Sequence, residues 1–230
     1  MTFRSGRWPR AIRWRPRRCG NCWSCCVYSR GDTLYVAYHV DYQYPLENSA
    51  DSLDTIFKGG PALDLMIGAD PNADPRRRDP VPGDIRLLVT QVNKKTQAAV
   101  FRAVVPGTKE PVRYESPVGS ATLDQVEDIT DKVKLAGGKH ADDTGKKDRY
   151  GLPVILKYSD YEFSVPLSAL GLSPRNGLTI RGDVGLLLGP SGATADRIYW
   201  HNKSASMTSD LPTEARLTPN LWGQWKFKAQ

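Results

Sequence analysis

"DTLYVAYHVDYQYPLEN", residues 32–48, decides the fold class because it begins with strict alternation of apolar and other residues. One side of this strand collects the large apolar side chains, namely Leu34, Val36, Tyr38 and Val40. The alternation stops at Asp41, after which two tyrosines precede Pro45. The pattern predicts a half-buried strand whose end delivers a carboxylate and phenol rings to a binding rim, to a catalytic site or to a purely structural contact.

The same strand-and-turn pattern continues to the end of the chain. A hairpin is expected over 27–36, a short helix over 50–60, a charged loop over 137–149, and a hairpin over 153–167 that turns at Ser159-Asp160. Further strands are expected over 61–70, 83–93, 96–105, 111–118, 129–136, 178–189, 196–202 and 222–227. About ten short strands with little helix predict an all-β, antiparallel β-sandwich over residues 27–230.

The positive net charge of +7 lies at one end of the chain. Residues 1–30 contain eight of the 32 basic residues and no acidic residue, which leaves 24 basic against 25 acidic residues in the remainder. The predicted domain is therefore nearly neutral, and we expect no nucleic-acid partner. No apolar run approaches the roughly 18 residues of a membrane helix, so we also expect no membrane span.

Residues 1–26 form a segment rich in Arg, Cys and Trp that differs from the rest in composition. It contains all four cysteines: Cys19, Cys22, Cys25 and Cys26. A zinc or iron–sulfur site and a basic nucleic-acid tail are alternatives, but no second distant ligand pair completes a metal site. We expect a disordered tail, or a stretch translated from a misplaced start codon. No apolar stretch follows the charges, so no signal peptide is identified.

The carboxylates and histidines do not form a recognisable catalytic set. No spacing selects a pair of carboxylates for glycoside hydrolysis, and no G-x-S-x-G motif occurs. We therefore expect no enzyme. "DPNAD", residues 70–74, has acidic and amide side chains at alternate positions, but Pro75 and Val81 replace the Gly and Glu of an EF-hand. We expect no cofactor, with calcium at a differently built site as an alternative.

The order of several motifs resembles the family 9 carbohydrate-binding modules and their DOMON-like relatives. These motifs are "LYVAYHVDY", "ALDLMIGAD", "YEFSVPLSALGL", "GDVGLLLG", "RIYWHN" and "LWGQWKF", which together span residues 27–227. The resemblance implies an immunoglobulin-like sandwich that binds glycans in an extracellular or periplasmic setting, commonly attached to secreted polysaccharide-processing or cell-surface proteins. The superfamily also contains haem-binding members, which here would have to use residues such as His39 and Met66.

The chain departs from this family in two places. The family has one or two strands ahead of "LYVAY", where this chain has the Arg/Cys segment, so the resemblance implies a domain truncated at its N-terminus. The family also clamps its sugar between two aromatic rings. Phe57 is nearest to one of them, and no aromatic residue stands between "YWHN" and "WG" for the other.

A sugar-binding site requires an exposed aromatic ring beside planar hydrogen-bonding groups. Residues of these types occur in three segments of the chain. The predicted carbohydrate-binding residues are Asp41, Tyr42, Tyr44, Phe57, His201, Asn202 and Asp210. The sequence thus predicts a non-catalytic, monomeric domain that binds an oligo- or polysaccharide. A structural or protein-interaction sandwich that binds no sugar is the alternative, favoured by the missing ring of the clamp.

Overall fold

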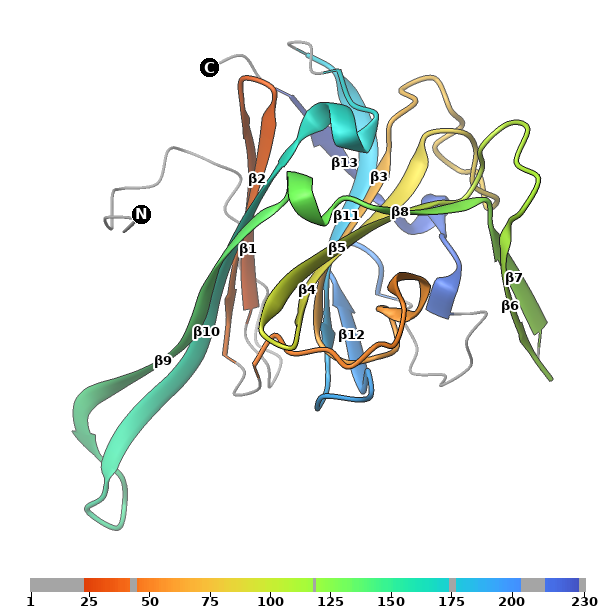
Figure 1. The fold of residues 1–230 in the computed structure, drawn as a ribbon. Helices are drawn as coiled ribbons and strands as arrows, with labels where there is room; N and C mark the ends of the chain where they lie inside the picture. The colour runs from red at the N-terminus through yellow and green to blue at the C-terminus, as the bar shows by residue number, and fades with distance from the viewer. Residues whose placement is uncertain (1–22, 42–44, 118, 174–176, 204–213, 228–230) are drawn as a thin grey trace.

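The protein is an antiparallel β-sandwich, as the sequence predicts (Figure 1). The computed structural model describes residues 23–41, 45–117, 119–173, 177–203 and 214–227. The strands are β1 (Trp23–Arg30), β2 (Thr33–Val40), β3 (Ala62–Gly68), β4 (Asp84–Val92), β5 (Lys95–Arg102), β6 (Val112–Ser116), β7 (Gly119–Leu123), β8 (Gln125–Asp128), β9 (Lys134–Lys147), β10 (Pro153–Pro166), β11 (Thr179–Leu188), β12 (Asp196–Tyr199) and β13 (Gly223–Lys226). Single turns of 3-10 helix lie at Leu53–Thr55, Thr130–Lys132, Leu167–Leu170 and Pro219–Leu221.

Two sheets form the layers of the sandwich. The four-stranded sheet has the order β1-β2-β10-β9, and the seven-stranded sheet has the order β12-β11-β3-β4-β5-β8, with β13 also paired to β11. A separate ribbon of β6 and β7 lies beside the seven-stranded sheet (Figure 1). The inward residues of β2 pack in the shared core with those of β3, β4 and β11.

Two hairpins have the turns that their sequences require. β1 and β2 are joined through Gly31, whose φ of 55° lies in the left-handed region. β4 and β5 are joined through Asn93 and Lys94, with φ of 51° and 61°. Two consecutive left-handed residues match the twist of the flanking strands, so a two-residue connection closes the hairpin without splaying it.

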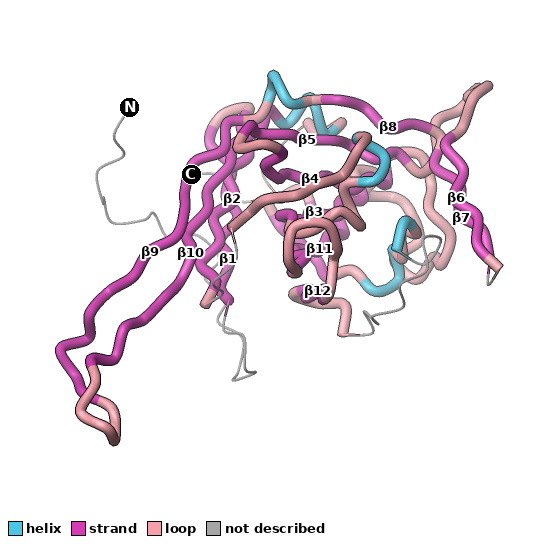
Figure 2. The backbone as a smooth tube through the Cα atoms, turned by 60° about the horizontal axis from the view of Figure 1, so that its bottom comes forward, coloured by secondary structure: helices cyan, strands magenta, loops and turns pink. Residues whose placement is uncertain are grey.

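Two expectations are wrong, the charged loop over 137–149 and the hairpin over 153–167 that turns at Ser159-Asp160. β9 and β10 are both 14 residues long and pair with each other, and their turn lies between Asp148 and Leu152. Ser159 and Asp160 form no turn because they pair with Val40 and His39 of β2. The charged residues of β9 remain compatible with a strand because the distal part of the β9–β10 ribbon extends away from the sandwich, where its side chains meet solvent (Figures 1 and 2).

The first strand begins inside the segment that the sequence assigns to the tail. Trp23 is only 4% exposed, and its ring stacks on Tyr38 at a centroid distance of 6.4 Å. Cys25 also packs against the core, while its neighbour Cys26 faces outward. Residues 23–26 therefore belong to the sandwich, and the expectation for residues 1–22 lies outside the described residues.

The outer faces of the two sheets are treated differently. The outer face of the seven-stranded sheet is covered by a second apolar cluster that includes Phe57, Tyr114, Leu217 and Trp222. The outer face of the four-stranded sheet carries side chains that are half-buried or exposed.

Candidate functional site

The predicted site begins at Asp41, which follows β2. Its side chain is about half exposed, and Asp41 Oδ1 lies 3.4 Å from His39 Nε2. Tyr42, Tyr44 and Asp210 lie outside the described residues. Asp41 is therefore available to a ligand.

Phe57 is not an exposed ring. Its relative exposure is 0%, and it packs edge-on against Phe101 and Tyr114 at centroid distances of 6.2 and 5.3 Å. Arg86 Cζ lies 5.9 Å from the centroid of the same ring. The prediction that Phe57 stacks on a sugar is wrong for this conformation, because apolar packing on the seven-stranded sheet occupies its faces and edges.

His201 and Asn202 do not join Asp41 at one rim. Their backbone N–H groups donate to the carboxylate of Asp183 on β11, each at 2.8 Å. Asp41 instead follows Val40, and Val40 lines a small pocket together with Leu188 of β11. Leu188 lies five residues beyond Asp183 on that strand. Five residues of strand span about 17 Å, and the two groups belong to different sheets. The expectation of a shared site is therefore wrong.

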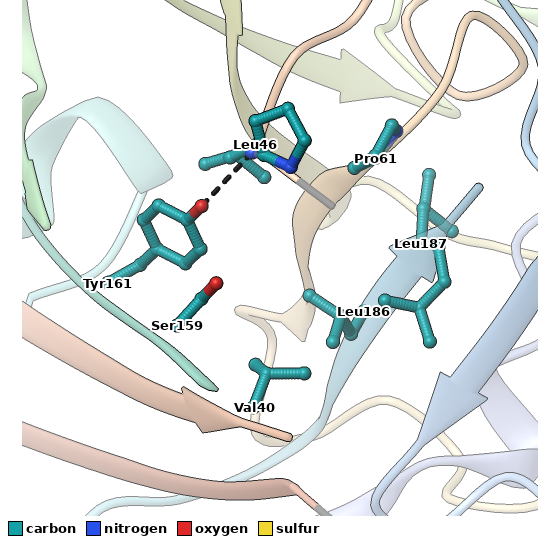
Figure 3. A pocket seen from close by; sticks show the side chains of 9 residues that line it. Val40, Leu46, Pro61, Ser159, Tyr161, Leu186 and Leu187 are labelled. Carbon is teal, nitrogen blue, oxygen red and sulfur yellow. Dashed lines mark hydrogen bonds between the residues drawn. The ribbon is translucent and has the colours of Figure 1, made fainter. Parts of the chain in front are cut away.

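The small pocket near Val40 is too narrow for a sugar (Figure 3). Its volume is about 10 Å³, which is the room of roughly one water molecule. Tyr161 from β10 closes one side, and its hydroxyl accepts a hydrogen bond from the backbone N–H of Leu46 at 3.0 Å. This pocket is part of the packing between the sheets.

The covered face of the seven-stranded sheet contains a buried polar cluster. Asp64 of β3 and Arg86 of β4 are 0% and 1% exposed, and Arg86 Nη2 donates to Asp64 Oδ2 at 2.7 Å. Arg86 Nε lies 3.1 Å from both carboxylate oxygens. Tyr199 of β12 donates its hydroxyl to Asp64 Oδ2 at 2.7 Å. Burial opposes the charge of Arg86, but Asp64 outweighs this effect and raises the arginine's pKa.

Other residues of the same chain pair with the remaining polar groups of this cluster. Arg86 Nη1 donates to the carbonyl oxygen of Glu214 at 2.8 Å, and the Glu214 side chain forms an ion pair with Arg197. Burial raises the pKa of Tyr199, which keeps its hydroxyl as a donor to Asp64. Buried charges are costly unless they are paired and hydrogen-bonded, and these charges are both. The cluster therefore anchors Glu214 over the sheet, and its polar groups are paired within the protein.

The outward face of the four-stranded sheet combines rings and carboxylates that are not covered in this way. The register of β1, β2, β9 and β10 places alternate side chains of each strand on one surface, which we call the outward face. Its members include Cys26, Tyr28, Arg30, Tyr35, Ala37, His39, Lys134, Ala136, His140, Tyr158, Asp160 and Glu162. Tyr28 and Tyr35 face each other across β1 and β2, with centroids 4.9 Å apart and an interplanar angle of 8°. Burial raises the pKa of Glu162.

A second group of rings lies further along the outward face. The Tyr158 ring is flanked by His39, at a centroid distance of 5.0 Å, and by His140, at 5.1 Å. His39 Nδ1 lies 2.6 Å from Asp160 Oδ1. The Tyr158 hydroxyl donates to Asp142 Oδ2 at 2.8 Å, and this bond is the main cause that raises the tyrosine's pKa. Half-exposed rings therefore lie beside carboxylates that can accept hydrogen bonds.

The sequence analysis does not identify most of this group, although the alternation of β2 indicates part of it. Tyr35, Ala37 and His39 alternate with the core residues of β2, which already assigns them to the outer side. The expected turn at Ser159-Asp160 hid their neighbours on β10, and the expected loop over 137–149 hid His140 on β9. The missing information was strand pairing between segments more than 100 residues apart.

The described residues contain no group of three or more His, Cys, Asp and Glu side chains placed to hold a metal ion. In the loop proposed as an alternative calcium site, Asp70 Oδ1 accepts the Asn72 N–H and Asp74 Oδ1 accepts the Arg76 N–H, each at 2.8 Å. These are local turn contacts. Within the same residues, no helix has the length and apolar character needed to cross a membrane.

Similar folds occur among solved structures, at low sequence identity. No family model and no curated protein matches the chain. A carbohydrate-binding module of family 9 from Caldicellulosiruptor kristjanssonii, solved with glucose, is 14% identical, with a TM-score of 0.47 and coverage of 96% of this chain and 83% of that one. A candidate carbohydrate-binding protein from Bacteroides uniformis is 12% identical, with a TM-score of 0.49 and coverage of 90% and 79%. At these values, the likeness assigns no function to this chain.

Proposed function

We propose that the chain is a non-catalytic carbohydrate-binding domain that holds an oligo- or polysaccharide on the outward face of the four-stranded sheet. The observation that carries the proposal is the ring of Tyr158 between His39 and His140, with Asp160 and Asp142 at its edge. Asp41 extends this group at the end of β2.

Sugar chemistry matches this arrangement. A pyranose presents C–H groups that pack on an aromatic face and hydroxyl groups that donate to carboxylates. Asp160 and Asp41 accept hydrogen bonds, and both carboxylates are about half exposed. His39 lies between them, within 2.6 Å of Asp160 and 3.4 Å of Asp41. The contacts among these groups fix ring and carboxylate positions before a ligand arrives, which reduces the entropy lost on binding.

The domain would act by binding rather than by bond cleavage. Its carboxylates are engaged with imidazole and phenol groups on a flat sheet surface, whereas a glycosidase sets two carboxyl groups on either side of the scissile bond. An extracellular or periplasmic setting is part of the proposal, since the family resemblance implies it.

A protein-interaction role is the second candidate, and one observation favours it. The distal part of the β9–β10 ribbon exposes large apolar side chains: Tyr150 at 72%, Leu152 at 61%, Leu156 at 57% and Ile155 at 43%. Exposed apolar groups of this size often mark contact surfaces. Tyr150 and Leu152 lie in the turn of this ribbon, whereas Leu156 pairs with Asp142 beside the proposed sugar site, so the two candidate surfaces adjoin each other.

Calorimetry with short oligosaccharides of a neutral glucan, a xylan and a mannan tests the proposal. We expect one of them to bind with a Kd roughly between the millimolar and micromolar ranges. Tyr158→Ala should abolish measurable binding, because it removes the ring between the two imidazoles. Tyr150→Ala is the matched control, since that tyrosine is exposed at the ribbon tip, and it should bind like the unmodified protein. Absence of binding by the folded protein to all three classes would contradict the proposal.

A further inference from the structure

We infer that the outward face binds an extended, neutral polysaccharide over several sugar units, along the direction of β2, rather than a single sugar or a chain end. The inference rests on the proposed function and adds the length of the ligand, its charge and the residues that select for both. It is carried by a second aromatic group on the same face, the Tyr28–Tyr35 pair.

The two aromatic groups have the spacing of a multi-unit site. Tyr35 and His39 are four residues apart on β2 and point to the same side, which separates them by about 13 Å. That distance exceeds one sugar ring, so a ligand that touches both groups must be a chain. Tyr28 lies opposite Tyr35, and Asp160 lies opposite His39, which widens the surface across the neighbouring strands.

Short side chains lie between the two aromatic groups. Ala37 is the residue between Tyr35 and His39 on this face, and its cross-strand neighbours are Cys26 and Glu162. Ala136 follows beside Glu162 on β9. A sugar unit above Ala37 would therefore meet little steric obstruction, and the carboxylate of Glu162 would accept its hydroxyl groups.

The charges of this surface select against acidic polymers. Asp160 and Glu162 lie on the face and Asp41 and Asp142 lie at its end, so four carboxylates outnumber the two basic residues of the face, Arg30 and Lys134. A uronic-acid or sulfated chain would bring further negative charge against these carboxylates, which is unfavourable at short range. A neutral polymer supplies the hydroxyl donors that carboxylates accept and adds no repulsion.

The test compares short and long oligosaccharides of the same neutral glucan, xylan or mannan by calorimetry. The unmodified protein should bind the long form at least about tenfold more tightly than the short form. Tyr35→Ala should remove this gain, so that the long and short forms bind this variant with equal affinity. Tyr35→Phe keeps the ring and should keep the gain. Circular dichroism identifies any variant that fails to fold, and Tyr28→Ala then provides an independent removal of the same ring pair.

The outcomes separate this inference from the proposed function. If a short oligosaccharide binds, but the long form binds no better and Tyr35→Ala has no effect, the inference is wrong and the proposed function stands. If polygalacturonate binds more tightly than every neutral polymer, the charge argument is wrong. If no oligosaccharide of either length binds, both the inference and the proposed function fail.

Discussion

The two outer faces of the sandwich carry similar residues in opposite states. On the seven-stranded sheet, Asp64, Arg86 and Tyr199 are buried and make hydrogen bonds to one another and to Glu214. On the four-stranded sheet, His39 and Asp160 remain about half exposed. A cluster of charged and aromatic groups therefore indicates a binding surface only where other residues of the chain do not cover it.

The physical reason lies in the cost of desolvation. A buried carboxylate needs partners for its charge and its hydrogen-bonding capacity, so the pairing of Asp64 contributes to stability. A ligand could reach Asp64 only if the covering residues moved. A half-exposed carboxylate such as Asp160 keeps contact with water and exchanges that water for sugar hydroxyls at lower cost. Variants on the two faces should therefore separate stability from binding.

The largest expected effect is that of Arg86→Met, which leaves Asp64 buried without its charge partner. We expect the free energy of unfolding, measured by urea denaturation, to fall by about 3–5 kcal/mol. The matched control is Arg102→Met, whose partner Glu127 is about one quarter exposed and whose loss should cost less than about 1 kcal/mol. Equal losses in the two variants would contradict the assignment of Arg86 to a buried structural cluster.

A somewhat smaller effect is expected for Phe57→Ala, which removes a ring packed against Phe101 and Tyr114. The cavity should lower the free energy of unfolding by about 3 kcal/mol. Carbohydrate affinity should be unchanged under conditions where the variant is folded. A variant of normal stability with lost sugar binding would return Phe57 to the clamp role that its position in the sequence suggested.

A smaller, pH-dependent effect is expected at Asp183. Burial raises the pKa of this carboxyl from 3.8 to about 6, although the N–H groups of Val184, His201 and Asn202 act in the opposite direction. The native state then binds a proton more tightly than the unfolded state, so this group's contribution to stability falls as pH rises between about 4 and 6. Over that window, the protein should lose about 2 kcal/mol relative to Asp183→Asn, measured by urea denaturation at each pH. A difference that is flat, or that rises with pH, would show that the three N–H bonds outweigh burial.

The sequence predicts the strands better than it predicts their neighbours. Alternation over residues 33–40 and the turn at Asn93-Lys94 indicate local structure correctly because both depend on adjacent residues. The pairing of β10 with β2 depends on residues more than 100 positions apart, so Asp160 was assigned to a turn and its contact with His39 was missed. Phe57 was misassigned for a related reason, since its burial is set by strands and a ribbon that follow it in the chain.

Mapping a bound sugar onto the sheets by nuclear magnetic resonance would show directly whether the four-stranded sheet holds the ligand. The probe is the neutral oligosaccharide that binds best in calorimetry, titrated into isotope-labelled protein while backbone amide shifts are followed. We expect the largest changes at β2 and β10 around His39, Tyr158 and Asp160, with changes near Tyr35 for the long form. Changes concentrated around Asp64 and residues 214–217, with none on the four-stranded sheet, would contradict this expectation.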